Sequence, residues 1–325
     1  MTKIDIYSGF LGAGKTTLIK KMIKEAYHGQ KLVLIENEFG EIGIDGGFLQ
    51  EAGINITEMN SGCICCSLVG DFGRALKKVI SEYHPDRILI EPSGVGKLSD
   101  VIGAVRKVTT DDVTLGNFVT VADATKCKMY MKNFGEFYNN QIETANTIIL
   151  SRTQNVDEKK LDECVKLLRD HNPNAVLVTT PWDQLTGEQM MEAMEQKTSI
   201  AMELEELEKE AHEHHHHDHD EHEHHHHHHG HDADEVFVSW GVETHKKFTT
   251  EQIEGILKQL EDAAQYGMVL RAKGYVASND SDRWIHFDYV PGESDIREGG
   301  AMVTGRVCVI GSKLNESAIA SLFGA

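Results

Sequence analysis

The sequence lacks any apolar run of the roughly 18 residues that a membrane-spanning helix needs. The opening residues, Met1–Phe10, also lack the long apolar core of a secretory signal peptide. We therefore expect a cytoplasmic protein without a membrane partner. Basic residues are few, 32 against 52 acidic ones, so we expect no nucleic-acid partner either.

Cysteine is also scarce, with six in 325 residues, which is too few for a disulfide framework. Three of the six crowd into Cys63, Cys65 and Cys66, and clustered thiols in a reducing compartment indicate metal or redox chemistry. The other three stand singly in apolar or helical contexts and are expected in the core: Cys127, Cys164 and Cys308.

The negative charge is concentrated in one segment. Residues 201–235 carry 13 acidic side chains against the single Lys209, and 14 of the 19 histidines lie between His212 and His231. The remaining 290 residues carry a net charge of only −8, which is ordinary for a globular protein. A histidine- and acid-rich stretch cannot bury apolar surface, so we expect a disordered linker there.

The first 180 residues alternate short apolar runs with helical patterns, which predicts an α/β fold with a doubly wound parallel sheet. The predicted strands are Lys3–Tyr7, Lys31–Glu36, Ile54–Glu58, Arg87–Glu91, Asn117–Ala122, Thr147–Leu150 and Ala175–Thr179. The predicted helices are Lys15–Tyr27, Ser67–Tyr83, Leu98–Lys107 and Asp157–His171, the last capped by Asp157.

Three segments follow from these patterns: a domain over 1–198, a linker over 199–234 and a domain over 235–325. Residues 186–211 are expected to be helical. Beyond the linker, strands at Val236–Val242, Val269–Ala277, Trp284–Val290 and Arg306–Ile310 and helices at Thr249–Tyr266 and Glu316–Phe323 predict a small α+β domain.

A nucleoside triphosphate site is predicted where the first strand meets the first helix. The residues fit the pattern Gly-x4-Gly-Lys-[Ser/Thr], in which backbone N–H groups surround phosphates at a helix N-terminus. Lys15 is expected to contact the β- and γ-phosphates, and the Thr16 hydroxyl to bind Mg²⁺. The expected nucleotide-binding residues here are Gly9, Gly12, Ala13, Gly14, Lys15, Thr16 and Thr17.

A second acidic group is expected at the end of a hydrophobic strand. Glu91 ends such a strand and is followed by Pro-Ser-Gly, so we expect it to hold Mg²⁺ or a water on it. Gly94 could bring its N–H near the γ-phosphate. Asp45 is a weaker candidate for a segment that responds to nucleotide.

The thiol cluster suits Zn²⁺ or Cu(I). Neighbouring residues of an extended segment point in opposite directions, so two of the thiols at Cys63, Cys65 and Cys66 are expected to bind directly. The fourth ligand comes from elsewhere, such as Glu38 or Glu41, or the position stays open for metal transfer.

These motifs together resemble the CobW family of P-loop GTPases. The likeness rests on Gly9–Thr17, Glu36–Asp45, Gly62–Cys66 and Glu91–Gly94, and it extends over nearly the whole chain. It implies a P-loop domain with a C-terminal α+β domain, GTP hydrolysis with Mg²⁺, and a role as a metallochaperone, most often for zinc. It also implies that the Cys-x-Cys-Cys motif binds the metal and that the segment around Glu38 senses the nucleotide.

One motif departs from the family. Asn-Lys-x-Asp, whose aspartate accepts two hydrogen bonds from guanine, is replaced by Ser151, Arg152, Thr153 and Gln154. Arg152 could still stack on a base, but one amide cannot reproduce the paired acceptance of a carboxylate. Guanine preference is therefore weakened, supplied by the loop at Pro181–Trp182, or replaced. GTP remains the favoured substrate, with Ser151, Arg152 and Gln154 as expected nucleotide contacts.

The histidine run mixes imidazoles with carboxylates, a composition that binds Zn²⁺, Ni²⁺, Co²⁺ or Cu²⁺. We expect it to be an accessory reservoir that supplies the thiol site; the alternative is a solvated linker. Its histidines are His212, His214, His215, His216, His217, His219, His222, His224, His225, His226, His227, His228, His229 and His231.

The leading hypothesis is a GTP-hydrolysing metallochaperone that transfers zinc, or else Co²⁺ or Ni²⁺, to a client metalloprotein. Alternatives are a nucleotide-regulated metal buffer, an accessory GTPase for cobalt or nickel insertion, and a small-molecule kinase. Because no glutamine or arginine finger is evident, slow intrinsic turnover is expected. A further hypothesis is a nucleotide-dependent homodimer, since such dimers occur among related GTPases.

Overall fold

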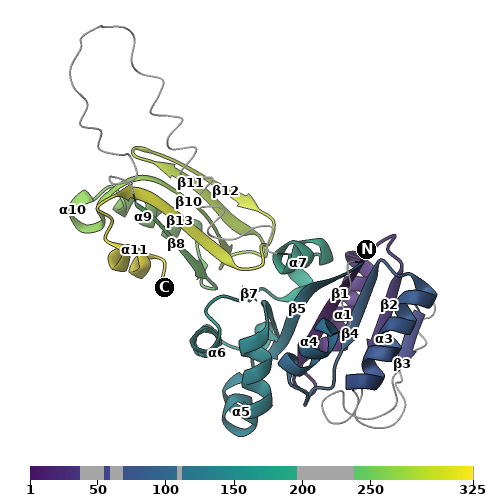
Figure 1. Cartoon of the computed structure of the whole chain (residues 1–325). Coiled ribbons are helices and arrows are strands. Elements are labelled where there is room, and N and C mark those ends of the chain that lie inside the picture. The colour runs from purple at the N-terminus through teal and green to yellow at the C-terminus, as the bar shows by residue number, and fades with distance from the viewer. Residues whose placement is uncertain (37–54, 59–68, 108–111, 196–237, 325) are drawn as a thin grey trace, which may run out of the picture. The chain divides into compact units, whose positions relative to one another are not determined.

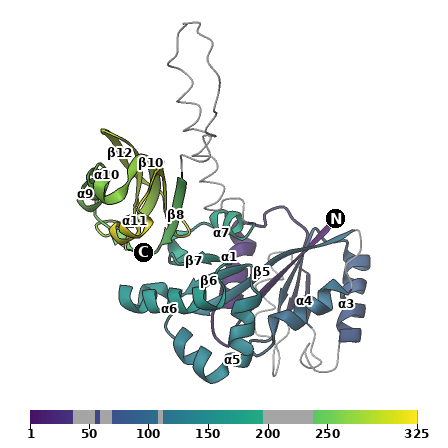
Figure 2. The same cartoon turned by 60° about the vertical axis from the view of Figure 1, so that its left-hand side comes forward.

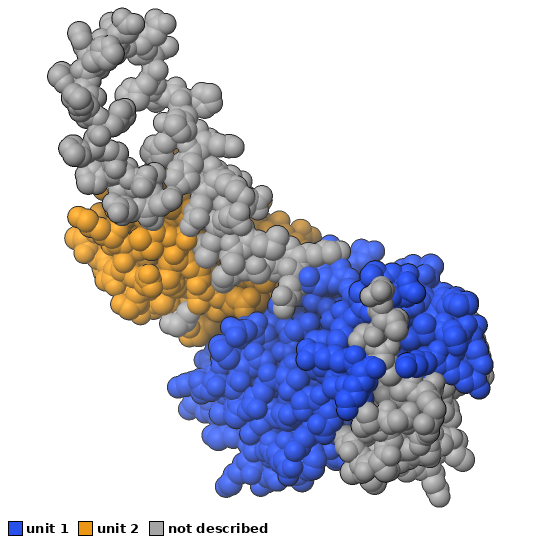
Figure 3. All heavy atoms as spheres, in the orientation of Figure 1, with its two compact units in different colours: residues 1–197 blue, residues 198–325 orange. Residues whose placement is uncertain are grey.

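The computed structural model describes residues 1–36, 55–58, 69–107, 112–195 and 238–324. The chain divides into two compact units, 1–197 and 198–325 (Figure 3). The predicted linker, residues 199–234, lies outside the described residues, so its boundaries remain predictions.

The described part of the first unit is built on a seven-stranded parallel sheet in the order β3-β2-β4-β1-β5-β6-β7 (Figures 1 and 2). Its strands are β1 (Thr2–Gly9), β2 (Leu32–Glu36), β3 (Asn55–Glu58), β4 (Arg87–Glu91), β5 (Val113–Asp123), β6 (Thr147–Ser151) and β7 (Val176–Val178). The predicted parallel α/β fold is therefore confirmed. Buried apolar side chains such as Ile4, Val33, Ile88 and Ile148 form the sheet's part of the core.

Helices cover both faces of this sheet (Figures 1 and 2). On one face α1 packs against α7, and on the other α3, α4, α5 and α6 pack in series. The helices are α1 (Lys15–Glu25), α3 (Val69–Tyr83), α4 (Leu98–Arg106), α5 (Cys127–Thr144), α6 (Glu158–His171) and α7 (Gly187–Met194). Asp157 caps α6 as predicted, accepting a hydrogen bond from the Lys160 N–H at 2.8 Å.

Helix α5 was not predicted. It contains a non-helical residue at Phe134 (φ −133°, ψ 28°), and its 18 residues include three asparagines, which are weak helix formers.

The three single cysteines are buried, as predicted. Cys127 and Cys164 are buried in the first unit, and Cys308 is buried in the second, which confirms that they belong to the cores. Of the predicted helix over 186–211, residues 187–194 form α7, and those beyond 195 lie outside the described residues.

The second unit has an antiparallel sheet in the order β12-β11-β10-β13-β8, with β9 added in parallel to β10. Its strands are β8 (Val238–Thr244), β9 (Lys247–Phe248), β10 (Met268–Ser278), β11 (Trp284–Val290), β12 (Glu293–Gly299) and β13 (Gly305–Ser312). Its helices are α9 (Thr250–Gln259), α10 (Ala263–Tyr266) and α11 (Glu316–Leu322), and their apolar side chains share a core with the sheet.

Two details of this unit correct the sequence prediction. Thr249–Tyr266 is not one helix, because the Asp262 side chain accepts hydrogen bonds from Ala264 N and Gln265 N and so starts the separate helix α10. Strand β12 was missed since it is almost entirely polar and exposed, as suits the edge of a sheet. None of the described helices has the length and apolar character needed to cross a bilayer.

Candidate functional site

The candidate site is the edge of the first sheet where the parallel strands end. The loops that follow β1, β4, β5, β6 and β7 meet at this edge, since all these strands run in the same direction. Ligands of open α/β sheets bind at this carboxyl edge. The residues predicted to bind nucleotide lie in these loops or in the strand ends and the helix start that adjoin them.

The loop between β1 and α1 has the backbone of a phosphate site. Gly9 has φ +144°, and a Cβ there would lie 2.4 Å from the carbonyl oxygen of Val121 on β5, so only glycine fits. Gly14 precedes α1 with φ +105°, and the first turn of α1 has neither a side-chain cap nor an acidic residue. The N–H groups of this turn are therefore available to an anion.

Lys15, Thr16 and Glu91 form a compact charged cluster beside this loop. The Thr16 hydroxyl donates to the Glu91 carboxylate, 3.0 Å from Oε1 and 3.2 Å from Oε2. The Lys15 ammonium nitrogen lies 4.0 Å from Glu91 Oε1, and Lys15 is only 9% exposed. A hydroxyl next to a carboxylate offers the oxygen ligands that Mg²⁺ prefers, so the residues fit this ion.

Gly94 lies directly against the phosphate-binding loop. A Cβ at Gly94 would be 2.8 Å from the backbone nitrogen of Leu11. The loop after β4 is fixed from behind by Gln141 of α5, whose amide donates to the carbonyls of Gly94 and Gly96 at 3.0 and 2.8 Å. Gln141 is fully buried, and sequence analysis missed it because only the tertiary fold brings it to this loop.

Arg152 connects the loop after β6 to the phosphate-binding loop. Its guanidinium donates to Asp123 Oδ2 at 2.8 Å and to the Gly12 carbonyl at 2.9 Å. Asp123, at the end of β5, is 2% exposed and also accepts two hydrogen bonds from Thr125. Sequence analysis missed Asp123, although an acidic residue at the end of a predicted strand was an available signal.

Residues from the end of β6 and from the loop after β7 also lie close to the start of α1. The Trp182 indole donates to the Leu150 carbonyl at 2.9 Å, and Trp182 Cη2 lies 3.2 Å from the position that a Cβ would take at Gly14. Ser151 Cβ lies 4.0 Å from the same position. Gln154 and Thr17 are exposed at this edge.

The predicted metal-binding residues lie outside the described residues: Cys63, Cys65, Cys66, Glu38, Glu41 and the fourteen histidines between His212 and His231. The same holds for Asp45. Among the described residues, no group of three or more histidine, cysteine or acidic side chains is arranged to hold a metal ion. The last described residues before these segments are Glu36, which is in register with Glu91, and Glu58, which ends β3.

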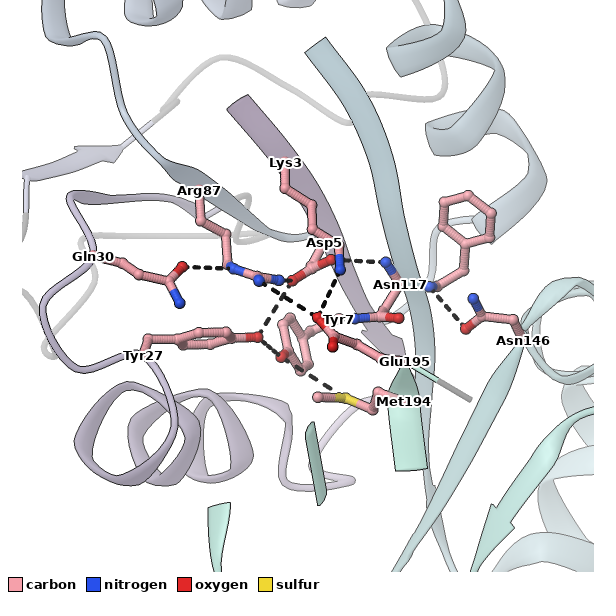
Figure 4. Close-up of polar contacts among 11 residues, drawn as sticks. Lys3, Asp5, Tyr7, Tyr27, Gln30, Arg87, Asn117, Asn146, Met194 and Glu195 are labelled. Atoms are coloured by element: carbon pink, nitrogen blue, oxygen red, sulfur yellow. Dashed lines mark hydrogen bonds and ion pairs between the residues drawn. The ribbon is translucent and has the colours of Figure 1, made fainter. Parts of the chain in front are cut away.

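A buried polar network lies toward the opposite ends of the strands (Figure 4). The Asp5 carboxylate accepts hydrogen bonds from Arg87, from Tyr27 at 3.3 Å and from the Asn117 N–H at 2.7 Å. Figure 4 shows Glu195 in the same network, where its carboxylate lies 2.8 Å from the Lys3 ammonium and 3.8 Å from the Arg87 guanidinium. Burial raises the pKa of Tyr7 and Tyr27, so both hydroxyls keep their protons in the folded protein.

The family is decided by comparison with known sequences. A model of the CobW/HypB/UreG nucleotide-binding domain matches residues 3–179, and a model of the cobalamin synthesis protein cobW C-terminal domain matches residues 237–325. The chain belongs to the CobW/HypB/UreG family. The resemblance inferred from the motifs is thereby confirmed.

Curated CobW-family relatives match part of the chain. The chain is 31% identical over 194 residues to "Zinc chaperone CobW" of Sinorhizobium sp, covering 51% of this chain and 53% of the relative. It is 37% identical over 102 residues to "Zinc chaperone YeiR" of Escherichia coli (strain K12), covering 31% of each. The chain thus spans about half or less of the length of these relatives. The solved structure of Zn(II)-bound YjiA GTPase from E. coli aligns at 18% identity with a TM-score of 0.41, covering 99% of this chain and 98% of that one.

Proposed function

We propose that this chain hydrolyses GTP with Mg²⁺ and couples its nucleotide state to the binding of a transition metal, foremost zinc, and its transfer to a client metalloprotein. Membership of the CobW/HypB/UreG family and relatives named zinc chaperones support this proposal. The single structural observation that carries the nucleotide part of the proposal is the cluster of Lys15, Thr16 and Glu91 at the start of an uncapped helix.

The described residues account for binding and charge balance in this reaction. The N–H groups of the first turn of α1 bind the phosphates, and Lys15 neutralises the charge that develops on the β- and γ-phosphates. Thr16 and Glu91 would hold Mg²⁺, which when bound neutralises phosphate charge. Gly94, positioned by Gln141, brings a backbone N–H toward the γ-phosphate.

Coupling between nucleotide and metal follows from the chain's connectivity. Glu36 ends β2 in register with Glu91 of β4, and the chain continues from it to Glu38 and Glu41. Cys63 follows the end of β3 by five residues, and the carboxyl ends of β2 and β3 share the edge that carries the phosphate-binding loop. Segments that begin at one edge can respond together to a γ-phosphate.

The histidine run is proposed to raise the local concentration of metal. Its fourteen imidazoles can bind several ions weakly, because a chain must be ordered when it binds them. Deletion of residues 212–231 should lower the number of Zn²⁺ ions bound per chain while leaving nucleotide binding intact. Full metal capacity after this deletion would contradict the reservoir.

The proposal is tested by measuring Zn²⁺ affinity with a chelating competitor in the presence of GDP and of a non-hydrolysable GTP analogue. The two affinities should differ in the wild type and become equal in Cys65→Ala/Cys66→Ala. Cys308→Ala, which removes a buried thiol of the second unit, serves as the control. Equal affinities in the wild type would favour the metal buffer.

A further inference from the structure

The segment after β6 places an amide where it can meet a nucleobase. Arg152 is hydrogen-bonded to Gly12, so this segment lies against the phosphate-binding loop, and Ser151 and Trp182 both approach Gly14. A nucleotide whose phosphates occupied this loop would have these residues beside it. Gln154 is exposed on the short 3₁₀ helix Thr153–Asn155, two residues after Arg152.

The surroundings indicate that this region receives a ligand. The hydroxyl oxygens of Ser151 and Thr153 are buried, and neither has a hydrogen-bond partner within the described ranges. Among the described residues, Asp123 is a buried carboxylate close to this segment, and it already accepts hydrogen bonds from Arg152 and Thr125. Asp183, beside Trp182, is exposed and is the remaining described carboxylate on the adjoining loop.

The hydrogen-bonding pattern of an amide differs from that of a carboxylate in a way that matters here. A carboxylate only accepts, so it pairs with the N1–H and 2-amino groups of guanine and is repelled by N1 of adenine. An amide both donates and accepts. In one orientation it pairs with N1–H and O6 of guanine and leaves the guanine 2-amino group unused. In the other orientation it pairs with N1 and the 6-amino group of adenine.

We infer that the Gln154 amide contacts the base edge, so that this chain accepts ATP as well as GTP and is insensitive to the guanine 2-amino group. This inference rests on the proposed nucleotide site and defines which nucleotides that site takes. Inosine triphosphate, which lacks only the 2-amino group of GTP, discriminates between the two modes of recognition. A site that hydrogen-bonds a given group rejects analogues without it, whereas an indifferent site does not.

The experiment is competition of GTP, ATP and inosine triphosphate against a fluorescent GDP analogue, with Mg²⁺, on the full chain. In the wild type the dissociation constants of GTP and ATP should agree within about tenfold, and those of GTP and inosine triphosphate within about threefold. Gln154→Asp should favour GTP over both by at least about tenfold more than the wild type. Asn155→Asp adds the same charge one residue away and should keep the wild-type ratios.

Two results would overturn the inference. A wild type that prefers GTP over both analogues by about a hundredfold must contact the 2-amino group through another acceptor, and loss of that preference in Asp183→Asn would identify it. Gln154→Asp with unchanged ratios would show that residue 154 does not face the base. Failure to bind any nucleotide would instead refute the proposed nucleotide site itself, which the binding assay distinguishes from a change in ratio.

Discussion

Thr16 donates its hydroxyl hydrogen to the Glu91 carboxylate, at 3.0 Å from the nearer oxygen. The two residues come from different elements, since Thr16 lies in the first turn of α1 and Glu91 ends β4. Strands β1 and β4 are hydrogen-bonded neighbours, which brings the loop after β1 to the end of β4. The proposed hydrolysis depends on this pair because it joins the phosphate-binding loop to the acidic group at the strand end.

Glu91→Gln keeps the size of the side chain and removes its charge. We expect phosphate release to fall by about a hundredfold and to need more Mg²⁺, because an amide binds the ion more weakly and no longer balances Lys15. The rate is measured as a function of Mg²⁺ concentration. Glu82→Gln, on an exposed face of α3 beside Lys78, is the matched control. An unchanged rate in Glu91→Gln would show that Glu91 is not part of the site.

Gly94→Ala should slow hydrolysis by displacing the phosphate-binding loop. The added Cβ would lie 2.8 Å from the Leu11 nitrogen, so one of the two loops must move, and small displacements at a reactive site cost up to about a hundredfold in rate. Gly103→Ala is the control, since residue 103 is an interior position of helix α4 and the new Cβ would have no atom within 4 Å. That control should keep the rate and gain about 1 kcal/mol of stability. Equal rates in the two variants would contradict the close approach.

Gln141→Leu should lower both stability and the turnover number. It leaves the carbonyls of Gly94 and Gly96 without their donor, at a cost of about 1–3 kcal/mol for each buried group. Chemical denaturation measures the free energy of unfolding, and steady-state kinetics measure kcat. Loss of stability with an unchanged kcat would mean that Gln141 supports the fold without positioning Gly94.

Stability should decline in alkali because of Tyr7 and Tyr27. Burial raises the pKa of both hydroxyls above the ordinary value of 10.0, so the folded chain keeps protons that the unfolded chain loses. The free energy of unfolding is therefore unaffected by these groups below about pH 10 and falls by about 1.4 kcal/mol per pH unit for each group above it. Tyr27→Phe should reduce this slope in denaturation measured from pH 8 to 11. The same slope in the variant would assign the alkaline loss to other groups.

Most of the first unit could be predicted from local sequence. The strands are continuous apolar runs because both faces of the sheet are covered, and Gly9 and Gly14 mark the phosphate-binding loop directly. Helix α5 was missed because its polar composition and the irregular backbone at Phe134 weaken the local signal. Strand β12 was missed since its exposed edge position needs no apolar residues.

Residues of the site could be predicted only where a local sequence motif marks them. Lys15, Thr16 and Glu91 follow from motifs at a strand end, whereas Gln141 reaches Gly94 across 47 positions of the sequence. Arg152 was expected near the base from its motif, but its hydrogen bonds to Asp123 and Gly12 depend on the packing of three loops. A single sequence can mark Asp123 as an acidic residue at a strand end, but it does not show which side chain reaches it.

The coupling of metal to nucleotide is tested most directly by phosphate release from GTP with and without one equivalent of Zn²⁺. It should be measured on the wild type, on Cys65→Ala/Cys66→Ala, and on Cys308→Ala as the thiol control. Zn²⁺ should change the rate of phosphate release in the wild type and in the control, and should leave it unchanged when the clustered thiols are removed. If Zn²⁺ binds to the wild type but leaves its rate of phosphate release unchanged, the coupling between metal binding and hydrolysis is contradicted.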